Sequence, residues 1–302
     1  MNYFPLFMNT VAILITCHNR KEKTIDCLVS FYKALNSFNE KQDLKIQVYL
    51  TDDGSTDGTG VDIKKHFPET KIIQGSGNLF WANGMRSSWQ TALKGNYDAY
   101  LLLNDDTTVY KDFLFELFKT HAYCLDTYKE AGIYVGATEN QQTKELTYSG
   151  AVVTNFFTAS IKVIVPDGVK YQRCDFGNAN IMLVPKEVVE KIGILSAGYA
   201  HGKADYDYTM MARKAKVPAL IGPKISGHCV YDHDHYYVNW ENKSLSERWK
   251  VLYSPTGIDF KSQLKFNRKF FPFRFPLVLL SGYFKLFFPK IYLRRFNIKH
   301  KE

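Results

Sequence analysis

Two adjacent acidic residues, Asp105 and Asp106, directly follow the short apolar run of residues 100–103. Such a run predicts a strand buried on both faces, and open α/β sheets bind ligands at the carboxyl ends of their strands. Neighbouring carboxylates repel each other unless a cation neutralises them, and Mg²⁺ commonly binds through one or two carboxylates and substrate phosphates. The segment therefore predicts a metal–diphosphate site at Asp105 and Asp106. The alternative is a turn or helix N-cap, where Asn and Asp are favoured anyway.

The elements that must position these acids alternate regularly through the first half of the chain. Apolar runs and helical spacing predict strands at 11–16, 46–50, 72–73 and 100–103, separated by helices at 25–35, after 61 and at 87–93. This alternation is typical of a parallel sheet and predicts a Rossmann-like nucleotide-binding half at residues 1–107. Neither GxGxxG nor GxxxxGK[ST] follows the first strand, so we expect carboxylates and a metal rather than a glycine-rich phosphate loop.

The second half is less regular. It predicts strands at 133–136, 151–154, 161–165 and within 176–185, helices at 185–192 and 205–214, and a further strand at 219–221. Two long loops remain, a glycine- and asparagine-rich segment at 75–86 and a glycine-bearing segment at 193–202.

The charge of the chain is unevenly distributed. The 302 residues, enough for one large domain or two small ones, carry a formal net charge of +9. Residues 261–302 hold eleven Lys or Arg and one acid, whereas the rest holds 28 bases and 29 acids. This distribution argues against a general nucleic-acid binder and for a localised electrostatic patch.

The cysteines and apolar segments favour a cytoplasmic protein. The five cysteines are odd in number and form no CxxC pair, which argues against a disulfide framework or zinc site and fits a reducing compartment. The N-terminus shows no basic segment with a clean apolar segment, so we expect no signal peptide. No uninterrupted apolar run is long enough to predict a membrane span.

Several segments together resemble a known enzyme family. The order of VAILITCHNR, LTDDGSTDGT, LNDDT and GKADYDYTMMARK is similar to that in family 2 inverting glycosyltransferases of the GT-A fold. GNLFWANGMR and FGNANIMLVP resemble a bacterial subgroup that includes rhamnosyltransferase-like enzymes. The resemblance implies an α/β GT-A domain at 1–240, with a nucleotide-binding half at 1–107 and an acceptor half at 108–240. A basic and aromatic helical extension would follow at 241–302.

The resemblance also assigns roles to individual residues. Asp205 occupies the position of the general base, although Ala204 replaces the Glu that usually precedes it. Asp106 and His228 would hold Mg²⁺ or Mn²⁺, and Asn104 replaces the first acid of the usual DxD motif. The nucleotide would be bound by Thr16, Asn19, Asp52, Asp53, Asn78, Asn104 and Asp105.

Each of these assignments has a structural alternative. The acids at 52–57 would also suit a turn that caps the next helix, and Asp205 and Asp207 would suit a solvated helix N-terminus. His228 is as well explained as a core or surface histidine. The run Asp232–His235 resembles a metal site, but adjacent loop residues rarely all face one ion. Phe80 and Trp81 are expected in the core more often than at a substrate.

The implied chemistry needs one base and one metal. An acceptor hydroxyl must lose its proton as it attacks the anomeric carbon, so a carboxylate must lie within hydrogen-bond reach. A divalent ion stabilises the charge on the leaving nucleoside diphosphate. The resemblance thus implies transfer from a UDP- or dTDP-sugar to a glycan or lipid-linked acceptor in surface polysaccharide biosynthesis. The alternatives are a nucleotidyltransferase and a non-catalytic glycan- or membrane-binding module.

The tail alternates aromatic and basic residues from Phe266 to Phe296. One interpretation is an interfacial amphipathic segment on an anionic membrane, with the enzyme peripheral at the inner face of the plasma membrane. The alternative is a C-terminal helix that packs on the domain or forms a dimer contact.

Overall fold

The computed structural model describes residues 8–231 and 237–295. Its strands are β1 (Thr10–Cys17), β2 (Lys45–Asp52), β3 (Lys71–Gln74), β4 (Ala99–Leu103), β5 (Thr108–Val109), β6 (Ile133–Glu139), β7 (Leu146–Tyr148), β8 (Gly150–Asn155), β9 (Ser160–Val163), β10 (Gln172–Arg173), β11 (Phe176–Gly177), β12 (Ile181–Pro185) and β13 (Ala219–His228). Its helices are α1 (Lys21–Asn39), α2 (Thr59–His66), α3 (Phe80–Ala92), α4 (Phe113–Tyr128), α5 (Lys186–Ile192), α6 (Ala204–Lys214), the 3₁₀ helix η2 (Trp240–Asn242), α7 (Leu245–Tyr253), α8 (Phe260–Phe270), α9 (Phe275–Phe287) and α10 (Pro289–Arg295).

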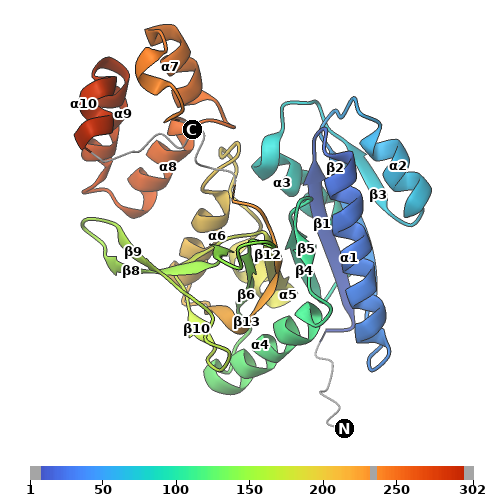
Figure 1. Ribbon diagram of the computed structural model, residues 1–302. Coiled ribbons are helices and arrows are strands. Elements are labelled where there is room, and N and C mark those ends of the chain that lie inside the picture. Colours follow the sequence, from blue (N-terminus) through green and yellow to red (C-terminus); the bar gives the residue numbers. More distant parts are fainter. Residues whose placement is uncertain (1–7, 232–236, 296–302) are drawn as a thin grey trace.

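A ten-stranded sheet forms the centre of the molecule (Figure 1). Its order is β10-β13-β6-β12-β4-β1-β2-β3, with β5 beside β13 and β7 beside β6. Strands β3, β2, β1 and β4 are parallel, whereas β12 runs antiparallel to β4 and β6. A separate three-stranded sheet contains β11, β8 and β9. The predicted α/β class with parallel strands in the first half of the chain is therefore confirmed.

Helices cover both faces of the large sheet, as the apolar strand sequences predict. In β1, Ile13 packs with α1 and α4 on one face, while Leu14 packs with α3, α5 and α6 on the other. In β4, Leu101 and Leu102 divide between the same two faces. Because these strands are buried on both faces, polar residues do not alternate with apolar ones along them. The two-sided burial also makes their carboxyl ends rigid positions from which loops can present polar side chains.

Helix α3 begins at Phe80, seven residues earlier than the sequence predicted. The Asp53 carboxylate accepts hydrogen bonds from the backbone N–H groups of Gly77, Leu79 and Phe80, at 2.7, 2.8 and 3.0 Å. These bonds satisfy donors at the helix start that have no intrahelical partner. The helix boundary thus depends on a carboxylate distant in sequence, which local periodicity does not reveal.

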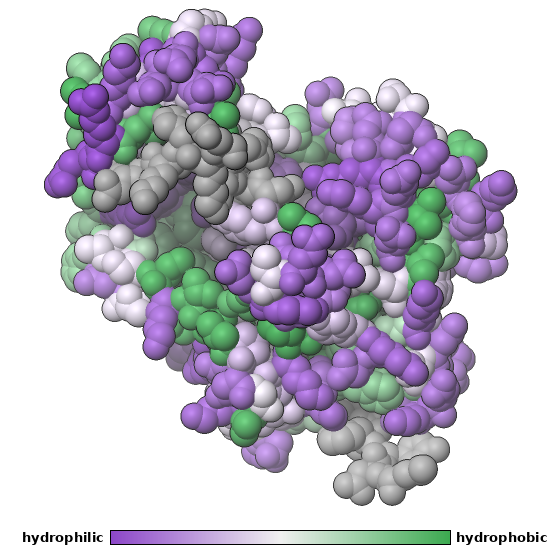
Figure 2. Space-filling model, in the orientation of Figure 1, coloured by the Kyte–Doolittle hydropathy of each residue, from purple (hydrophilic) through white to green (hydrophobic). Residues whose placement is uncertain are grey.

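Helices α7 to α10 form a lobe at the upper left of Figure 1, apart from the helices that flank the sheet. Within the lobe, Trp240, Phe260 and Leu286 are fully buried in a common cluster. A second cluster joins the lobe to the domain, because Phe266 and Phe270 of α8 pack with residues of β11 and α6. Figure 2 shows hydrophobic atoms at the left edge of this lobe, beside hydrophilic ones. Within the described residues, no helix is long and apolar enough to cross a membrane.

Candidate active site

A cavity of about 320 Å³ lies at the carboxyl end of β4 and reaches the start of α6. Its walls come from widely separated parts of the chain, including the turn between β11 and β12 and the loop between α7 and α8. The lining residues are Arg20, Trp81, Asn104, Asp105, Asp106, Tyr148, Asn178, Ala179, Asn180, His201, Asp205, Cys229 and Thr256. Four of the predicted site residues, Asn104, Asp105, Asp106 and Asp205, therefore meet in one cavity.

The acid pair is held by an arginine. Arg20 Nη1 lies 2.7 Å from Asp106 Oδ2 and 3.4 Å from Asp105 Oδ1. Burial, and then the Asp106 carboxylate, raise the pKa of Asp105 to about 7, and Arg20 opposes this rise. Asp106 Oδ1 also lies 3.6 Å from the Cys229 thiol. One guanidinium therefore does not fully neutralise the negative charge of these two buried carboxylates.

These two carboxylates fit a hard divalent ion. Asp105 Oδ2 is buried and makes no hydrogen bond within the described part of the chain. An oxygen in this state is costly unless a further partner arrives. The residues that the structure describes contain no group of three or more His, Cys, Asp or Glu arranged for a metal. Because Mg²⁺ usually takes only one or two carboxylates alongside substrate phosphates, a pair of acids is sufficient.

His228 lies apart from the acid pair. Its ring packs edge-on against Tyr110, with ring centroids 4.7 Å apart, and its Nδ1 is 3.9 Å from Glu139 Oε1. It is absent from the lining of the cavity, whereas its neighbour Cys229 is present. The structure therefore does not bring His228 together with Asp106, because its ring faces the end of β6. The hypothesis of a metal site at Asp232–His235 falls outside the described residues.

Asn104 is oriented by an aromatic side chain. Trp81 Nε1–H donates a 2.7 Å hydrogen bond to Asn104 Oδ1, and the Asn104 backbone N–H donates to the carbonyl of Asn180. Trp81 packs partly against the core, as expected, but it also lines the cavity. The indole thus fixes the amide of Asn104, leaving its NH₂ group as the donor for a ligand.

Asp205 lies in the first turn of α6 and lines the same cavity as the acid pair. Its Oδ1 accepts a 2.8 Å hydrogen bond from the backbone N–H of Tyr206. Burial raises the pKa of Asp205 to about 6, although this hydrogen bond and the nearby Lys203 favour the ionised form. The helix N-terminus also favours a carboxylate at this position. The pKa of Asp205 thus lies close to neutral pH, in the range that suits a general base.

The remaining predicted nucleotide residues organise loops beside the cavity. Asp52 is 5% exposed, and its Oδ1 accepts from the backbone N–H of Ser55 at 2.9 Å. Asn19 Oδ1 accepts from the backbone N–H of Thr56 at 2.7 Å, which links the end of β1 to the loop after β2. Asp57, rather than Asp52, accepts from the N–H of Thr59 at the start of α2. These contacts match the structural alternative for the acidic loop and leave nucleotide contacts as a prediction.

Thr16 and Asn78 also lie outside the cavity lining. Thr16 is buried against α3, where a Cβ added to Gly84 would come within 2.1 Å of Thr16 Oγ1. Asn78 is exposed in the loop that the Asp53 carboxylate organises. Both therefore lie near the carboxyl ends of β1 and β3, next to the candidate site.

Sequence reasoning missed several residues of the cavity wall. Arg20 belongs to the CHNR motif, so its basic side chain directly after the first strand was an available signal. Tyr148, His201 and Thr256 gave no local signal, because each comes from a different loop or strand end. Thr256 belongs to the C-terminal extension, so the extension contributes to the site.

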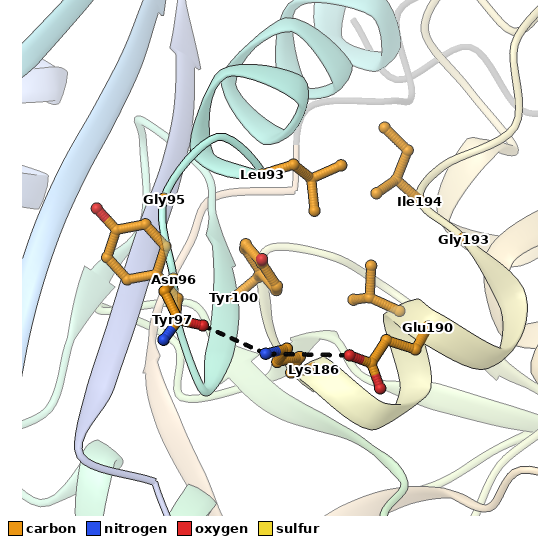
Figure 3. A pocket seen from close by; sticks show the side chains of 10 residues that line it. Leu93, Gly95, Asn96, Tyr97, Tyr100, Lys186, Glu190, Gly193 and Ile194 are labelled. Carbon is orange, nitrogen blue, oxygen red and sulfur yellow. Dashed lines mark hydrogen bonds and ion pairs between the residues drawn. The ribbon is translucent and has the colours of Figure 1, made fainter.

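A second cavity, of about 550 Å³, lies at the opposite end of β4 (Figure 3). Tyr97, Tyr100 and Leu93 line it, and Lys186 bonds to Asn96 Oδ1 at 3.2 Å and pairs with Glu190 at 4.0 Å. Although this cavity is larger, it contains neither the acid pair nor Asp205. The smaller cavity therefore remains the candidate active site.

Comparison with known proteins agrees with this geometry. Residues 12–147 match the model of glycosyl transferase family 2. This segment is therefore similar to the glycosyltransferase domains of family 2. The domain includes the acid pair and ends before Asp205, so the proposed base lies in the part of the chain beyond the match. The search of curated proteins gave no match.

Solved structures show that the glycosyltransferase domain has the GT-A fold. The mannosyltransferase PcManGT from Pyrobaculum calidifontis, solved with GDP-Man and Mn²⁺, superposes with a TM-score of 0.55 at 14% identity. The alignment covers 97% of this chain and 74% of that chain. TarS 1-349 from S. aureus, solved with UDP, gives a TM-score of 0.51 at 13% identity, covering 76% of this chain and 62% of that chain. These likenesses establish the fold, and the rhamnosyltransferase-like subgroup stays a prediction.

Proposed function

We propose that the chain is a metal-dependent inverting glycosyltransferase that moves a sugar from a UDP- or dTDP-linked donor to a glycan or lipid-linked acceptor. The observation that carries the proposal is the single cavity lined by both the acid pair and Asp205. The pair offers a diphosphate-metal site, and Asp205 offers a base in the same cavity. An in-line displacement needs groups on both sides of the anomeric carbon.

The donor end of the cavity would be built by Asp105, Asp106 and Arg20. Asp106 and Asp105 would hold Mg²⁺ or Mn²⁺, which when bound would stabilise the charge that develops on the leaving diphosphate. Arg20 already lies against both acids, so its guanidinium is placed to bind a phosphate once the acids have another cation. Asn104, oriented by Trp81, would donate its NH₂ group to the donor.

The acceptor end would be built around Asp205. Its carboxylate would accept the proton of the acceptor hydroxyl as that oxygen attacks the anomeric carbon. A pKa near 6 suits this role, because the group is largely ionised at neutral pH while remaining a better proton acceptor than an ordinary Asp. Asn178 and Asn180, which line the cavity at the turn between β11 and β12, would position hydroxyl groups of the acceptor.

Solved structures support a nucleoside diphosphate donor in general, whereas the exact donor and the pathway go beyond them. PcManGT and TarS were solved with GDP-Man and UDP, both nucleoside diphosphate compounds. A UDP- or dTDP-sugar donor and a role in surface polysaccharide biosynthesis extend this to the present chain. A cytoplasmic location is supported by the five cysteines, which are all buried and free of disulfides.

Product analysis tests the proposal. The chain would be incubated with UDP- and dTDP-sugars, Mn²⁺ and a set of glycan and lipid-linked acceptors. Free nucleoside diphosphate together with an extended acceptor is the expected result. Release of pyrophosphate would instead identify a nucleotidyltransferase and overturn the proposal. Tight binding of donor and acceptor without any turnover would favour the non-catalytic module.

A further inference from the structure

Helix α9 and the segments beside it carry a continuous row of exposed apolar side chains. On α9 itself, Leu277 and Leu280 are each 66% exposed and Phe287 is 57% exposed. The row, which we call the apolar stripe, consists of Phe273, Leu277, Leu280, Phe284, Phe287, Phe288 and Ile291. Their spacing of three and four residues places the α9 members on one helix face.

The opposite face of α9 fixes the direction in which the stripe points. Gly282 lies so close to α8 that an added Cβ would come within 2.0 Å of Phe260 Cζ. Leu286 is fully buried in the same contact. Because the inner face is packed this tightly, α9 cannot turn the stripe inward without losing the cluster around Phe260. The stripe therefore stays on the surface of the lobe.

The stripe extends to a second element. Phe157, at the turn between β8 and β9, is 70% exposed, and its ring lies 5.5 Å from that of Phe273. The hairpin tip thus lies at the same level as the beginning of α9. The exposed apolar area therefore extends over two elements. It is larger than the area of the single apolar side chains that are commonly exposed on protein surfaces.

The chain segment that carries the stripe has basic residues and no acidic ones before its last position. Residues 261–301 contain no Asp or Glu. On α10, Lys290, Arg294 and Arg295 are exposed, and the two arginines follow the exposed Ile291 by three and four residues, so they share its helix face. Apolar side chains flanked by bases on one face are the pattern of a helix that lies in a membrane interface.

We propose that the apolar stripe and the α10 bases dock the protein on an anionic lipid surface. The apolar side chains would enter the boundary between head groups and acyl chains, while the bases would contact lipid phosphates. A second copy of the chain is a poorer occupant, because it would bring the same positive charge against the stripe. The surface is thus complementary to a layer that is apolar inside and negative outside.

Docking would also hold the active site at a defined position relative to the lipid surface. Thr256, between α7 and α8, lines the candidate active site. Asp259, the residue that precedes α8, accepts a 3.1 Å hydrogen bond from the backbone N–H of Gly202, in the loop that leads to α6. The lobe and the acceptor end of the cavity are therefore physically connected. This benefit to a lipid-linked acceptor rests on the proposed function, whereas docking itself does not.

Vesicle flotation of the full chain tests the proposal. We expect binding to phosphatidylcholine vesicles that contain phosphatidylglycerol, weakened by salt, and little binding to phosphatidylcholine alone. Leu280→Glu should lower partitioning about tenfold or more, because it replaces an apolar contact with a charge that anionic lipid repels. Val61→Glu, at a 75% exposed position on α2, is the matched control and should bind as the parent does.

The basic contribution is tested separately. The double variant Arg294→Gln and Arg295→Gln should reduce partitioning about 30-fold, since each base near an anionic surface contributes roughly 1 kcal/mol. Lys94→Gln, at an exposed position just after α3, is the control. An unchanged melting temperature of each variant would confirm folding and keeps this test independent of the proposed function.

Two results would overturn the docking proposal. Parental vesicle binding by both Leu280→Glu and the double arginine variant would show that other residues carry the membrane contact. Conversion of a dimer to a monomer by Leu280→Glu, with vesicle binding unchanged, would identify the stripe as an interface between copies of the chain. Point variants are needed because truncation before Phe266 would also remove side chains that pack on the domain.

Discussion

Replacing Lys269 by Met should destabilise the protein through a single buried carboxylate. Lys269 lies on α8 of the extension, and its Nζ is 2.7 Å from Asp207 Oδ1 on α6. The Asp207 side chain is fully buried, and it also accepts hydrogen bonds from the hydroxyls of Tyr199 and Ser196. The substitution removes the cation that contacts this carboxylate directly and leaves a buried charge with two neutral donors.

The size of the effect follows from these contacts. Removing one partner of a fully buried ion pair costs about 3–5 kcal/mol. Lys269 is itself 33% exposed, which lowers the cost, and the two hydroxyls continue to solvate the carboxylate. We therefore expect the free energy of unfolding to fall by about 2 kcal/mol, within the usual range for a hydrogen bond to a charged group.

Urea denaturation followed by tryptophan fluorescence would measure this change. Lys261→Met is the matched control, because Lys261 is exposed on the same helix. A loss below about 0.5 kcal/mol, the range of ordinary surface substitutions, would refute the view that the extension is bonded into the catalytic region. Turnover should also fall in Lys269→Met, since Asp205 lies only two residues before Asp207 on α6.

Three further predictions concern the site itself. Asp106→Ala should abolish Mn²⁺-dependent binding of UDP or dTDP in titration calorimetry, whereas Asp126→Ala, an exposed acid on α4, should bind normally; intact metal-dependent affinity in Asp106→Ala would exclude Asp106 as the ligand. Turnover at saturating donor should rise with pH through about 6 and then level off, because Asp205 accepts a proton only when ionised; a flat profile from pH 5 to 8 would contradict this assignment. Gly84→Ala should lower stability by about 1–3 kcal/mol in thermal unfolding, because its methyl group would meet Thr16, and an unchanged melting temperature would show that α3 shifts freely.

The sequence predicted the first half of the fold well because its strands are buried on both faces. The run at 11–16 is apolar up to its last residue, Thr16, and the run at 100–103 has no charged residue. Strands β1 and β4 begin and end within one residue of these runs. The start of α3 was predicted wrongly, because Asp53 organises it from a distant loop. Local periodicity contains no information about such a contact.

In the candidate site, too, some residues could be predicted from the sequence and others depend on tertiary packing. Asp105, Asp106 and Asp205 were proposed from the sequence, and the structure places them around one cavity. His228 was proposed beside Asp106, but the direction of its ring depends on the packing of β13 against β6, which the sequence alone does not define. The contribution of Thr256 follows from how the extension docks on the domain.

The sequence left two alternatives for the tail, an exposed amphipathic segment or a helix packed on the domain. The structure shows one part of the tail packed and another part exposed. The first aromatic residues of the tail, Phe266, Phe270 and Phe271, are buried against the domain. The later ones, Phe284 and Phe287, remain on the surface. Alternating aromatic and basic residues look alike in both settings, because only the packing of α9 on α8 decides which side faces inward. Membrane contact by the exposed part stays a prediction.

The most direct test of the account is the turnover of Asp205→Asn relative to its donor affinity. The substitution keeps the shape of the side chain and removes the proton acceptor. The account predicts donor binding within a few-fold of the parent and turnover lower by about 10²-fold or more, the usual effect of losing a positioned base. Turnover within a few-fold of the parent, with donor binding preserved, would show that another group accepts the proton and would contradict the proposed mechanism.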